Sequence, residues 1–503
     1  MKKGDTMSSN NSNSVLVTRR AWFILAILSS TLLTVFFSET MLLPAIPEII
    51  QDFKIPYGMA AWIFSAYLIV AAVMTPVAGR LSDLYGKKKV LLALLIVYIA
   101  GLIAGGFAND ISFLLITRLI QGVGLAAVPA AFSLLRDIFP PSRLAIAIGV
   151  FGSAYSAGSV VGLLMGASII QHFGWHATFL SIVPFSVLVT LMIAKFVKEN
   201  TKLKPVAHNV IETQDINPNK TYLKLSIDIK GVLTLAVTIT SFIIGLTLIQ
   251  IGVDSQNLPF IVTAFISSAI SLAIFVFIER RELHPFFDLR LLRNRMLLPS
   301  YLLLIVTGIA MFMIYPTIVQ MVRSPIPLGF GGDSVDAANV QLPFMLMFLI
   351  FSSISPIIIN KAGSIRPIII GGILSLIGAI GLLAFHSSEL AVSTNLAIIA
   401  SGLSLTITPT WNMVVTSSPK EFTGISVGVG ALLLFIGMAL GPAIAGVYME
   451  SQAVQVADGF YPSPNSYNLI FLTVGMLSVV SIVFALILRR GKEKIDIVLE
   501  DKK

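Results

Sequence analysis

Cysteine is absent from the chain, and charged residues are scarce in it. None of the 503 residues is cysteine, which excludes disulfides, thiolate metal sites, iron-sulfur clusters and cysteine nucleophiles. Only 12% of the residues are charged and 56% are hydrophobic, whereas soluble domains carry about 25% charged residues. A water-soluble particle of this composition would expose too much apolar surface. We therefore interpret the chain as a polytopic membrane protein and exclude soluble enzymes and nucleic-acid binders.

The residue clusters that catalysis requires are also lacking. The 5 histidines lie in loops or at the ends of hydrophobic segments, away from any group of carboxylates that would bind a catalytic metal. The sequence has no Gly-rich loop with its lysine that would cradle the phosphates of ATP. We therefore expect no enzyme activity, no metal and no cofactor. A membrane-embedded enzyme or a non-transporting sensor is the least favoured alternative.

Long hydrophobic runs are what the sequence has in abundance. A helix needs about 20 apolar residues to cross the hydrocarbon core, because every backbone polar group in lipid must be satisfied within the segment. The sequence predicts an all-α membrane protein with 14 transmembrane helices, and this even number places both termini on one side. The predicted spans are 21–46, 58–79, 90–108, 111–135, 144–168, 177–197, 231–252, 258–278, 297–321, 338–359, 367–386, 391–414, 424–448 and 467–488.

The basic residues follow this topology. Cytoplasmic loops accumulate lysine and arginine, and of the 34 lysines and arginines all except three fall on the side that holds both termini. Lys54 and Arg323 fall on the opposite side, and Arg118 lies within a span. The net charge of +9 therefore indicates orientation rather than nucleic-acid binding. We expect a multi-pass protein of the plasma membrane with both termini in the cytoplasm.

An internal repeat divides the chain. Gly149, Gly158 and Gly162 in the fifth predicted span recur with the same spacing as Gly428, Gly437 and Gly441 in the thirteenth. Two six-helix pseudo-repeats plus two inserted helices account for the 14 spans. We predict a cytoplasmic N-terminal tail (1–20), an N-terminal six-helix bundle (21–197), a polar cytoplasmic linker (198–230), the two inserted helices (231–278), a C-terminal six-helix bundle (297–488) and a cytoplasmic tail (489–503).

Two repeated halves imply a carrier. Transporters built from such repeats place the cargo between the halves and alternate access by rocking one half against the other. A channel is expected to show rings of charged residues or a carbonyl-lined filter, and the sequence shows neither.

Two ionisable residues lie deep within predicted spans. Glu39 and Arg118 each lie about seven residues from the outer end of their spans, which is roughly 10 Å of helix. A charge in lipid costs several kcal/mol, so its presence suggests a function. The pair is either a structural ion pair or a carboxylate that exchanges a proton under the influence of Arg118.

Glycines and lysines mark the loop after the second span. The glycines allow a tight turn and close helix approach, the acidic residue can cap a helix or pair with a base, and the lysines fix the inner side. On these grounds alone the segment is either a functional contact or a turn with a topology signal. The residues concerned are Gly79, Asp83, Gly86, Lys87 and Lys88.

These motifs resemble those of the major facilitator superfamily, and within it the 14-helix drug:proton antiporter branch of tetracycline and multidrug exporters. The segment from Gly79 to Lys89 is similar to the loop motif of that superfamily, whose acidic residue, here Asp83, forms a gating contact. The segment from Arg118 to Gly124 is similar to its fourth-span motif, whose arginine is implicated in proton transfer. The resemblance covers essentially the whole chain and implies the major facilitator fold. Four glycines resemble the antiporter motif of the fifth span, namely Gly149, Gly158, Gly162 and Gly166.

The chain departs from that branch at several positions. Leu163 replaces the proline expected directly after Gly162, and Ala167 replaces the second glycine of the pair that begins at Gly166. In the first span Ser38 occupies the place of the usual aspartate, and the acidic residue, Glu39, follows it.

Export of amphipathic cations suits this set of residues. A cavity lined by aromatic residues, methionines and a few polar groups, with one acidic counter-charge, adapts to cargo of different shapes. Glu39 would attract a cation, and Gln121, Tyr155 and Tyr315 are the polar groups that we expect along the substrate pathway. We expect a proton from outside to protonate Glu39, weaken cation binding and release the drug outward.

The alternative is a carrier of the same fold that moves a small metabolite by uniport or symport, which the residue at Leu163 favours slightly. In either case the expected partners are a small-molecule substrate, protons or Na⁺, and the lipid bilayer, with no nucleic acid. We expect a monomer.

Overall fold

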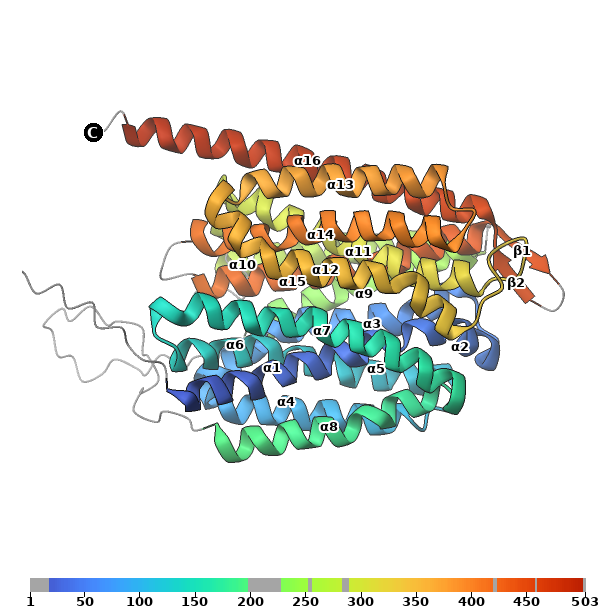
Figure 1. Cartoon of the computed structure of the whole chain (residues 1–503), viewed down its shortest axis with the longest axis horizontal. Helices are drawn as coiled ribbons and strands as arrows, with labels where there is room; N and C mark the ends of the chain where they lie inside the picture. Colours follow the sequence, from blue (N-terminus) through green and yellow to red (C-terminus); the bar gives the residue numbers. More distant parts are fainter. Residues whose placement is uncertain are drawn as a thin grey trace, which may run out of the picture.

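The computed structural model describes residues 18–197, 228–251, 256–282, 289–418, 423–456 and 459–500. Most of the predicted linker, residues 198–227, lies outside these ranges. Within them, 14 segments are helical, long and apolar enough to cross a membrane, which confirms the all-α fold class and the predicted number of spans. The helices run roughly parallel along the long axis of the molecule (Figure 1).

The N-terminal half contains the first six spans. Its first span is a helix pair joined by a short 3-10 turn, and its fourth span is a helix pair that breaks at Ala126. The elements are α1 (Arg19–Thr40), η1 (Leu43–Ala45), α2 (Ile46–Phe53), α3 (Tyr57–Tyr85), α4 (Lys87–Gly105), α5 (Ile111–Leu125), α6 (Ala127–Ile138), α7 (Pro141–Phe173) and α8 (Trp175–Phe196).

The C-terminal half contains the last six spans. A two-stranded antiparallel hairpin connects its last two long helices, and α16 continues as a helix well past the predicted end of the last span. The elements are η2 (Leu289–Arg293), α11 (Leu297–Arg323), α12 (Ser334–Ala362), α13 (Ile365–Ala384), α14 (Glu389–Ser417), α15 (Thr423–Ser451), β1 (Ala453–Val456), β2 (Gly459–Pro462) and α16 (Pro464–Glu500).

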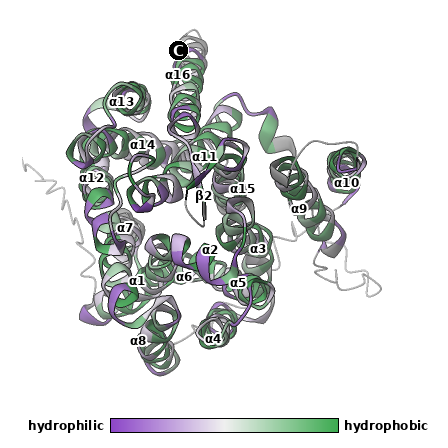
Figure 2. Cartoon of the chain, turned by 90° about the vertical axis from the view of Figure 1, so that its right-hand side faces the viewer, coloured by the Kyte–Doolittle hydropathy of each residue, from purple (hydrophilic) through white to green (hydrophobic). Residues whose placement is uncertain are grey.

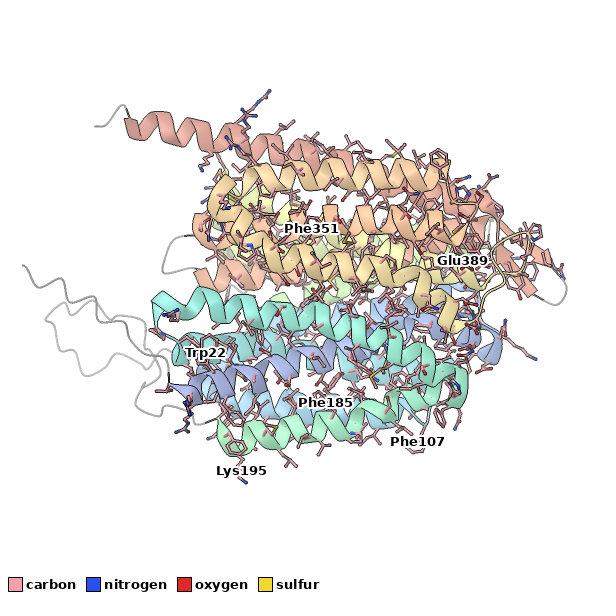
Figure 3. All side chains as sticks on the ribbon, viewed as in Figure 1. Trp22, Phe107, Phe185, Lys195, Phe351 and Glu389 are labelled. Carbon is pink, nitrogen blue, oxygen red and sulfur yellow. The ribbon has the colours of Figure 1, made fainter. Side chains whose placement is uncertain are left out.

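The inserted helices α9 (Ile229–Ile251) and α10 (Leu258–Arg281) stand beside the two halves, next to α3 and α15 (Figure 2). Only 28% and 22% of their most apolar windows are buried, compared with 72% for the spans of α1 and α11. Apolar side chains face outward elsewhere too, and Phe107 and Phe185 are examples (Figure 3). An outer surface of this kind suits contact with lipid.

Polar residues define the helix ends. Asp110 caps α5 by accepting a hydrogen bond from the backbone N–H of Phe113 at 2.9 Å. Asp333 and Asp336 form a reciprocal capping box at the start of α12, which satisfies two backbone donors that the helix leaves free. The two ends of the bundle are named by what lies there (Figure 1). The terminal end holds Arg19 and the end of α16, and the far end, opposite to it, holds the hairpin.

Glycines bring pairs of helices into backbone contact. A Cβ at Gly158 would lie 2.5 Å from the carbonyl oxygen of Leu33, and one at Gly162 would lie 2.5 Å from that of Phe37, so α7 rests directly on α1. In the other half Gly441 packs in the same way on Ile309 of α11. In each half the last two of the three repeated glycines therefore serve close helix packing, whereas a Cβ at the first, Gly149 or Gly428, would meet no atom within 4 Å.

This packing can be tested with valine. We expect Gly162→Val to lower the thermal stability of the detergent-solubilised protein, because the new side chain must displace the α1 backbone and overpacking of this kind costs about 1–3 kcal/mol. Gly152→Val in the same helix is the matched control, since a Cβ there meets no atom within 4 Å. The measurement is the melting temperature from size-exclusion chromatography of heated samples, and equal values for the two variants would contradict the packing role.

Candidate functional site

The Glu39 side chain is buried, within electrostatic range of tyrosines from both halves. It lies in the last turn of α1 and is 2% exposed. Within the described ranges neither of its carboxylate oxygens has a hydrogen-bond partner, and no direct ion pair joins it to Arg118. The two residues still interact electrostatically. The structural ion pair considered as an alternative is therefore not formed in this conformation.

Arg118 is held by its own half. Its Nε donates to the carbonyl of Ile63 at 2.9 Å, and its Nη1 donates to Oε1 of Gln121 at 2.8 Å. The Gln121 amide in turn donates to the carbonyl of Gly101 at 2.9 Å. The guanidinium lies 4.2 Å from the ring centroid of Tyr67, a distance typical of a cation–π contact. Gln121 thus positions Arg118, and its contact with cargo stays a prediction.

Four tyrosines interact electrostatically with the Glu39 carboxylate. Tyr67 and Tyr98 belong to the N-terminal half, where the Tyr98 hydroxyl donates to Oγ of Ser38 at 2.5 Å. Tyr155 and Tyr315 come from α7 and α11, one from each half. Glu39 therefore has hydroxyl groups of both halves around it. Tyr67 and Tyr98 were not among the residues expected at the site, although a phenol in the middle of an apolar span needs a polar partner and is a usable signal.

Aromatic rings connect the two halves beside this carboxylate. The ring centroid of Tyr155 lies 4.1 Å from that of Phe36 and 6.0 Å from that of Phe348. The centroids of Phe348 and Phe344 are 6.3 Å apart, and those of Phe344 and Tyr315 are 5.2 Å apart. We call these five rings the aromatic run. The Tyr155 hydroxyl also lies 3.9 Å from the sulfur of Met311. The predicted pathway residues Tyr155 and Tyr315 thus share one aromatic and thioether-lined region with Glu39.

Polar contacts between the halves concentrate at the far end. Arg323 of α11 forms a 2.9 Å ion pair with Glu48 of α2, and the Gln171 amide of α7 donates to Asp333 at 2.8 Å. Arg323 was one of two basic residues on the outer side in the sequence, and the ion pair gives it a structural role. A small apolar pocket lies between the halves near this end, lined by residues that include Ala61 and Gly446.

Tyr57 adds a further set of far-end contacts. Its backbone N–H donates to Glu450 of α15 at 3.0 Å, and its hydroxyl donates to the carbonyl of Phe460 in β2 at 3.0 Å. The same hydroxyl accepts from Gln320 of α11 at 2.9 Å. The hairpin and two helices of the C-terminal half are therefore tied to the start of α3.

Open space adjoins several glycines in the part of the bundle toward the terminal end. A Cβ at Gly79, Gly149 or Gly428 would meet no atom within 4 Å, whereas those at Gly158 and Gly441 would meet backbone. Among the described residues, the hydrogen bonds between α7 and α12 extend toward the terminal end as far as Ser156 with Ser352, at 3.4 Å. This conformation is closed at the far end and looser at the terminal end.

The loop motif residues lie at the terminal end. α3 continues through Gly79 to Tyr85, and the turn is confined to Gly86, whose φ of 98° suits glycine. Lys87 forms a 2.6 Å ion pair with Asp137, and Lys88 donates to the carbonyl of Ala194 at 2.7 Å. The side chain of Asp83 lies outside the described part, so its gating contact stays a prediction.

The sequence pattern of the Major Facilitator Superfamily matches residues 28–442, which is most of the chain. The chain belongs to the Major Facilitator Superfamily. It is therefore a membrane transporter and not an enzyme, as its composition and repeat predicted.

Relatives of this transporter are proteins of drug resistance and export. Multidrug resistance protein 3 of Bacillus subtilis is 27% identical over 416 residues, which cover 81% of this chain and 75% of the relative. The multidrug transporter protein MdtP of the same species is 25% identical, over 85% of this chain and 75% of its own length. The tetracenomycin C resistance and export protein of Streptomyces glaucescens is 24% identical, over 87% of this chain and 77% of its own length.

Solved structures share the fold of this transporter. The POT family transporter PepTSo superposes with a TM-score of 0.64 at 16% identity and covers 94% of this chain and 98% of its own. The human organic anion transporter MFSD10 superposes with a TM-score of 0.62 at 15% identity and covers 92% of this chain and 99% of its own. These likenesses confirm the major facilitator fold.

Loss of the far-end ion pair is expected to loosen that end of this transporter. Arg323→Met leaves Glu48 partly buried without its partner, which should disfavour the closed far end by about 1 kcal/mol, or roughly fivefold in the population ratio. Because the chain has no cysteine, Ala61→Cys in the far-end pocket provides a unique reporter. The measurement is the rate at which a membrane-impermeant maleimide labels it.

Lys54→Met is the matched control for this ion-pair test, since it removes the other basic residue of the far end. We expect labelling to accelerate with Arg323→Met and not with Lys54→Met. Equal rates in the two variants would show that the ion pair does not hold the far end closed.

Proposed function

We propose that this transporter exports amphipathic organic cations in exchange for protons. The observation that carries the proposal is the Glu39 carboxylate, which is buried near tyrosines of both halves without a hydrogen-bond partner in the described ranges. An unpaired charge in such a place is costly, and either a proton or a cationic cargo removes that cost. Competition between the two for one carboxylate couples their movement.

The terminal end faces the cytoplasm in this proposal, because the basic residues concentrate there. A cation enters from that end, stacks against the aromatic run at Tyr155 and Phe348, and neutralises Glu39. The far-end contacts then open while the terminal end closes, and a proton from outside displaces the cation. In this conformation Arg118, held by Gln121, lies within electrostatic range of Glu39. Relatives named for multidrug resistance and multidrug transport support the export of drugs in general.

A proton-release assay tests the proposal. In inside-out vesicles that carry a proton gradient, we expect a lipophilic cation to evoke proton release with wild type and with Glu39→Asp. Release should be lost with Glu39→Gln, because an amide cannot exchange a proton. The measurement is the fluorescence of a pH-sensitive dye after addition of tetraphenylphosphonium.

Glu389→Gln is the matched control for this assay, since it makes the same change at an exposed carboxylate (Figure 3) and should leave proton release unchanged. Release that persists in Glu39→Gln would remove Glu39 from the coupling. Replacing the proton gradient by a Na⁺ gradient tests Na⁺ as the coupling ion.

A metabolite carrier is the second candidate function. It is favoured by Leu163, which occupies the position of the antiporter proline and is fully buried next to the glycine contact of α7 with α1. If inserted wild type evokes no proton movement with a panel of lipophilic cations, uptake of amino acids, sugars and organic acids becomes the next measurement.

A further inference from the structure

Two seams separate the halves of this transporter along its sides. The first lies between α3 and α15, where the Ser65 hydroxyl donates to the carbonyl of Ala439 at 2.7 Å. The second lies between α7 and α12, where Ser156 contacts Ser352 at 3.4 Å. In a symmetric pair of halves both seams would face the bilayer in the same way.

The inserted helices cover the α3–α15 seam. Helix α9 contacts both α3 and α15, and its buried residues Leu235, Ile239 and Ile243 belong to the main apolar core. These residues recur at helical spacing, so one face of α9 lies on the bundle along much of its length. Near the far end the Trp62 indole N–H donates to Oγ1 of Thr247 at 2.8 Å.

Helix α10 in turn lies on the outer side of α9. The hydroxyls of Ser268 and Ser271 donate to the α9 carbonyls of Thr238 and Thr234 at 2.9 and 2.7 Å. The first seam thus has two further helices between it and the surroundings (Figure 2).

The α7–α12 seam has no such cover among the described helices (Figure 2). One stripe of α7 faces α12, and its contacts run from Gln171 at the far end through Ala167, whose carbonyl accepts from Ser334 at 3.3 Å, to Ser156. The next positions of that stripe toward the terminal end are Gly152 and Gly149, four and seven residues before Ser156.

At both glycines the space is open. A Cβ there meets no atom within 4 Å, and both residues are exposed. The α7–α12 seam is therefore open on the side of Ser156 that faces the terminal end. Tyr155, which directly precedes Ser156 in α7, contacts the aromatic run and interacts with Glu39.

We propose that cargo enters from the bilayer through the α7–α12 seam, between Ser156 and the terminal end, and that α9 and α10 close the other seam to such entry. The proposal rests on the proposed export function and specifies the route and the cargo class, which is an amphipathic cation dissolved in the leaflet at the terminal end. Glycine at positions 149 and 152 leaves room for passage, and Tyr155 is the first aromatic contact.

Lipid accessibility tests the route without any transport. The repeat-related variants Gly149→Cys and Gly428→Cys place one cysteine in open space beside each seam, in a chain that otherwise has none. Each is labelled with bimane and reconstituted in nanodiscs that contain phosphatidylcholine with a doxyl group near the headgroup end of its acyl chain. We expect several-fold stronger quenching at position 149 than at position 428.

Equal quenching at the two positions, or stronger quenching at 428, would overturn the proposal. Elution of each labelled variant at the wild-type volume establishes that it is folded. A second pair, Gly152→Cys and Ala431→Cys, gives the same comparison one turn farther from the terminal end and decides the question if a member of the first pair is unstable.

Transport gives an independent comparison. We expect Gly152→Trp, which fills the opening, to slow export of tetraphenylphosphonium several-fold, while Gly428→Trp, which fills open space beside the covered seam, retains it. Equal rates in the two variants would contradict entry through the α7–α12 seam. If wild type does not move this cation, the export function fails for it, and the quenching comparison still decides whether lipid reaches the opening.

Discussion

A single carboxylate in an apolar region is the constraint on which the rest of this transporter depends. Glu39 is buried without a hydrogen-bond partner among the described residues, and Arg118, which interacts with it electrostatically, is hydrogen-bonded to Ile63 and Gln121 instead. A charge held in this way has a high free energy until a proton or another cation reaches it. Tyrosines of both halves lie within electrostatic range of it, so a ligand that changes the charge of Glu39 can influence the relative position of the halves.

The distribution of contacts between the halves determines which end is closed. At the far end the Glu48–Arg323 ion pair and the hydrogen bonds of Tyr57 cross from one half to the other. At the terminal end Gly149 and Gly428 lie beside open space. Within each half, by contrast, glycine brings helix backbones into contact, as Gly162 does on α1. Tight packing inside the halves and breakable polar contacts between them favour movement of each half as a rigid body.

The inserted helices make the two sides of the molecule unequal. Helix α9 lies across the α3–α15 seam through Leu235, Ile239 and Ile243, whereas no described helix lies across the α7–α12 seam. For cargo that partitions into lipid, an uncovered seam beside Tyr155 shortens the path to the site.

The sequence by itself determined the 14 spans, the repeat and the family, because hydrophobic length and glycine spacing are local properties that lipid imposes on each segment. It also identified Glu39 and Arg118, since charges in apolar spans are conspicuous. Only the tertiary structure decided that these two do not form an ion pair, that Tyr67 and Tyr98 belong to the same site, and that Arg323 reaches Glu48. Those facts depend on the rotation and tilt of helices far apart in the chain, and helix packing fixes these after the spans are formed.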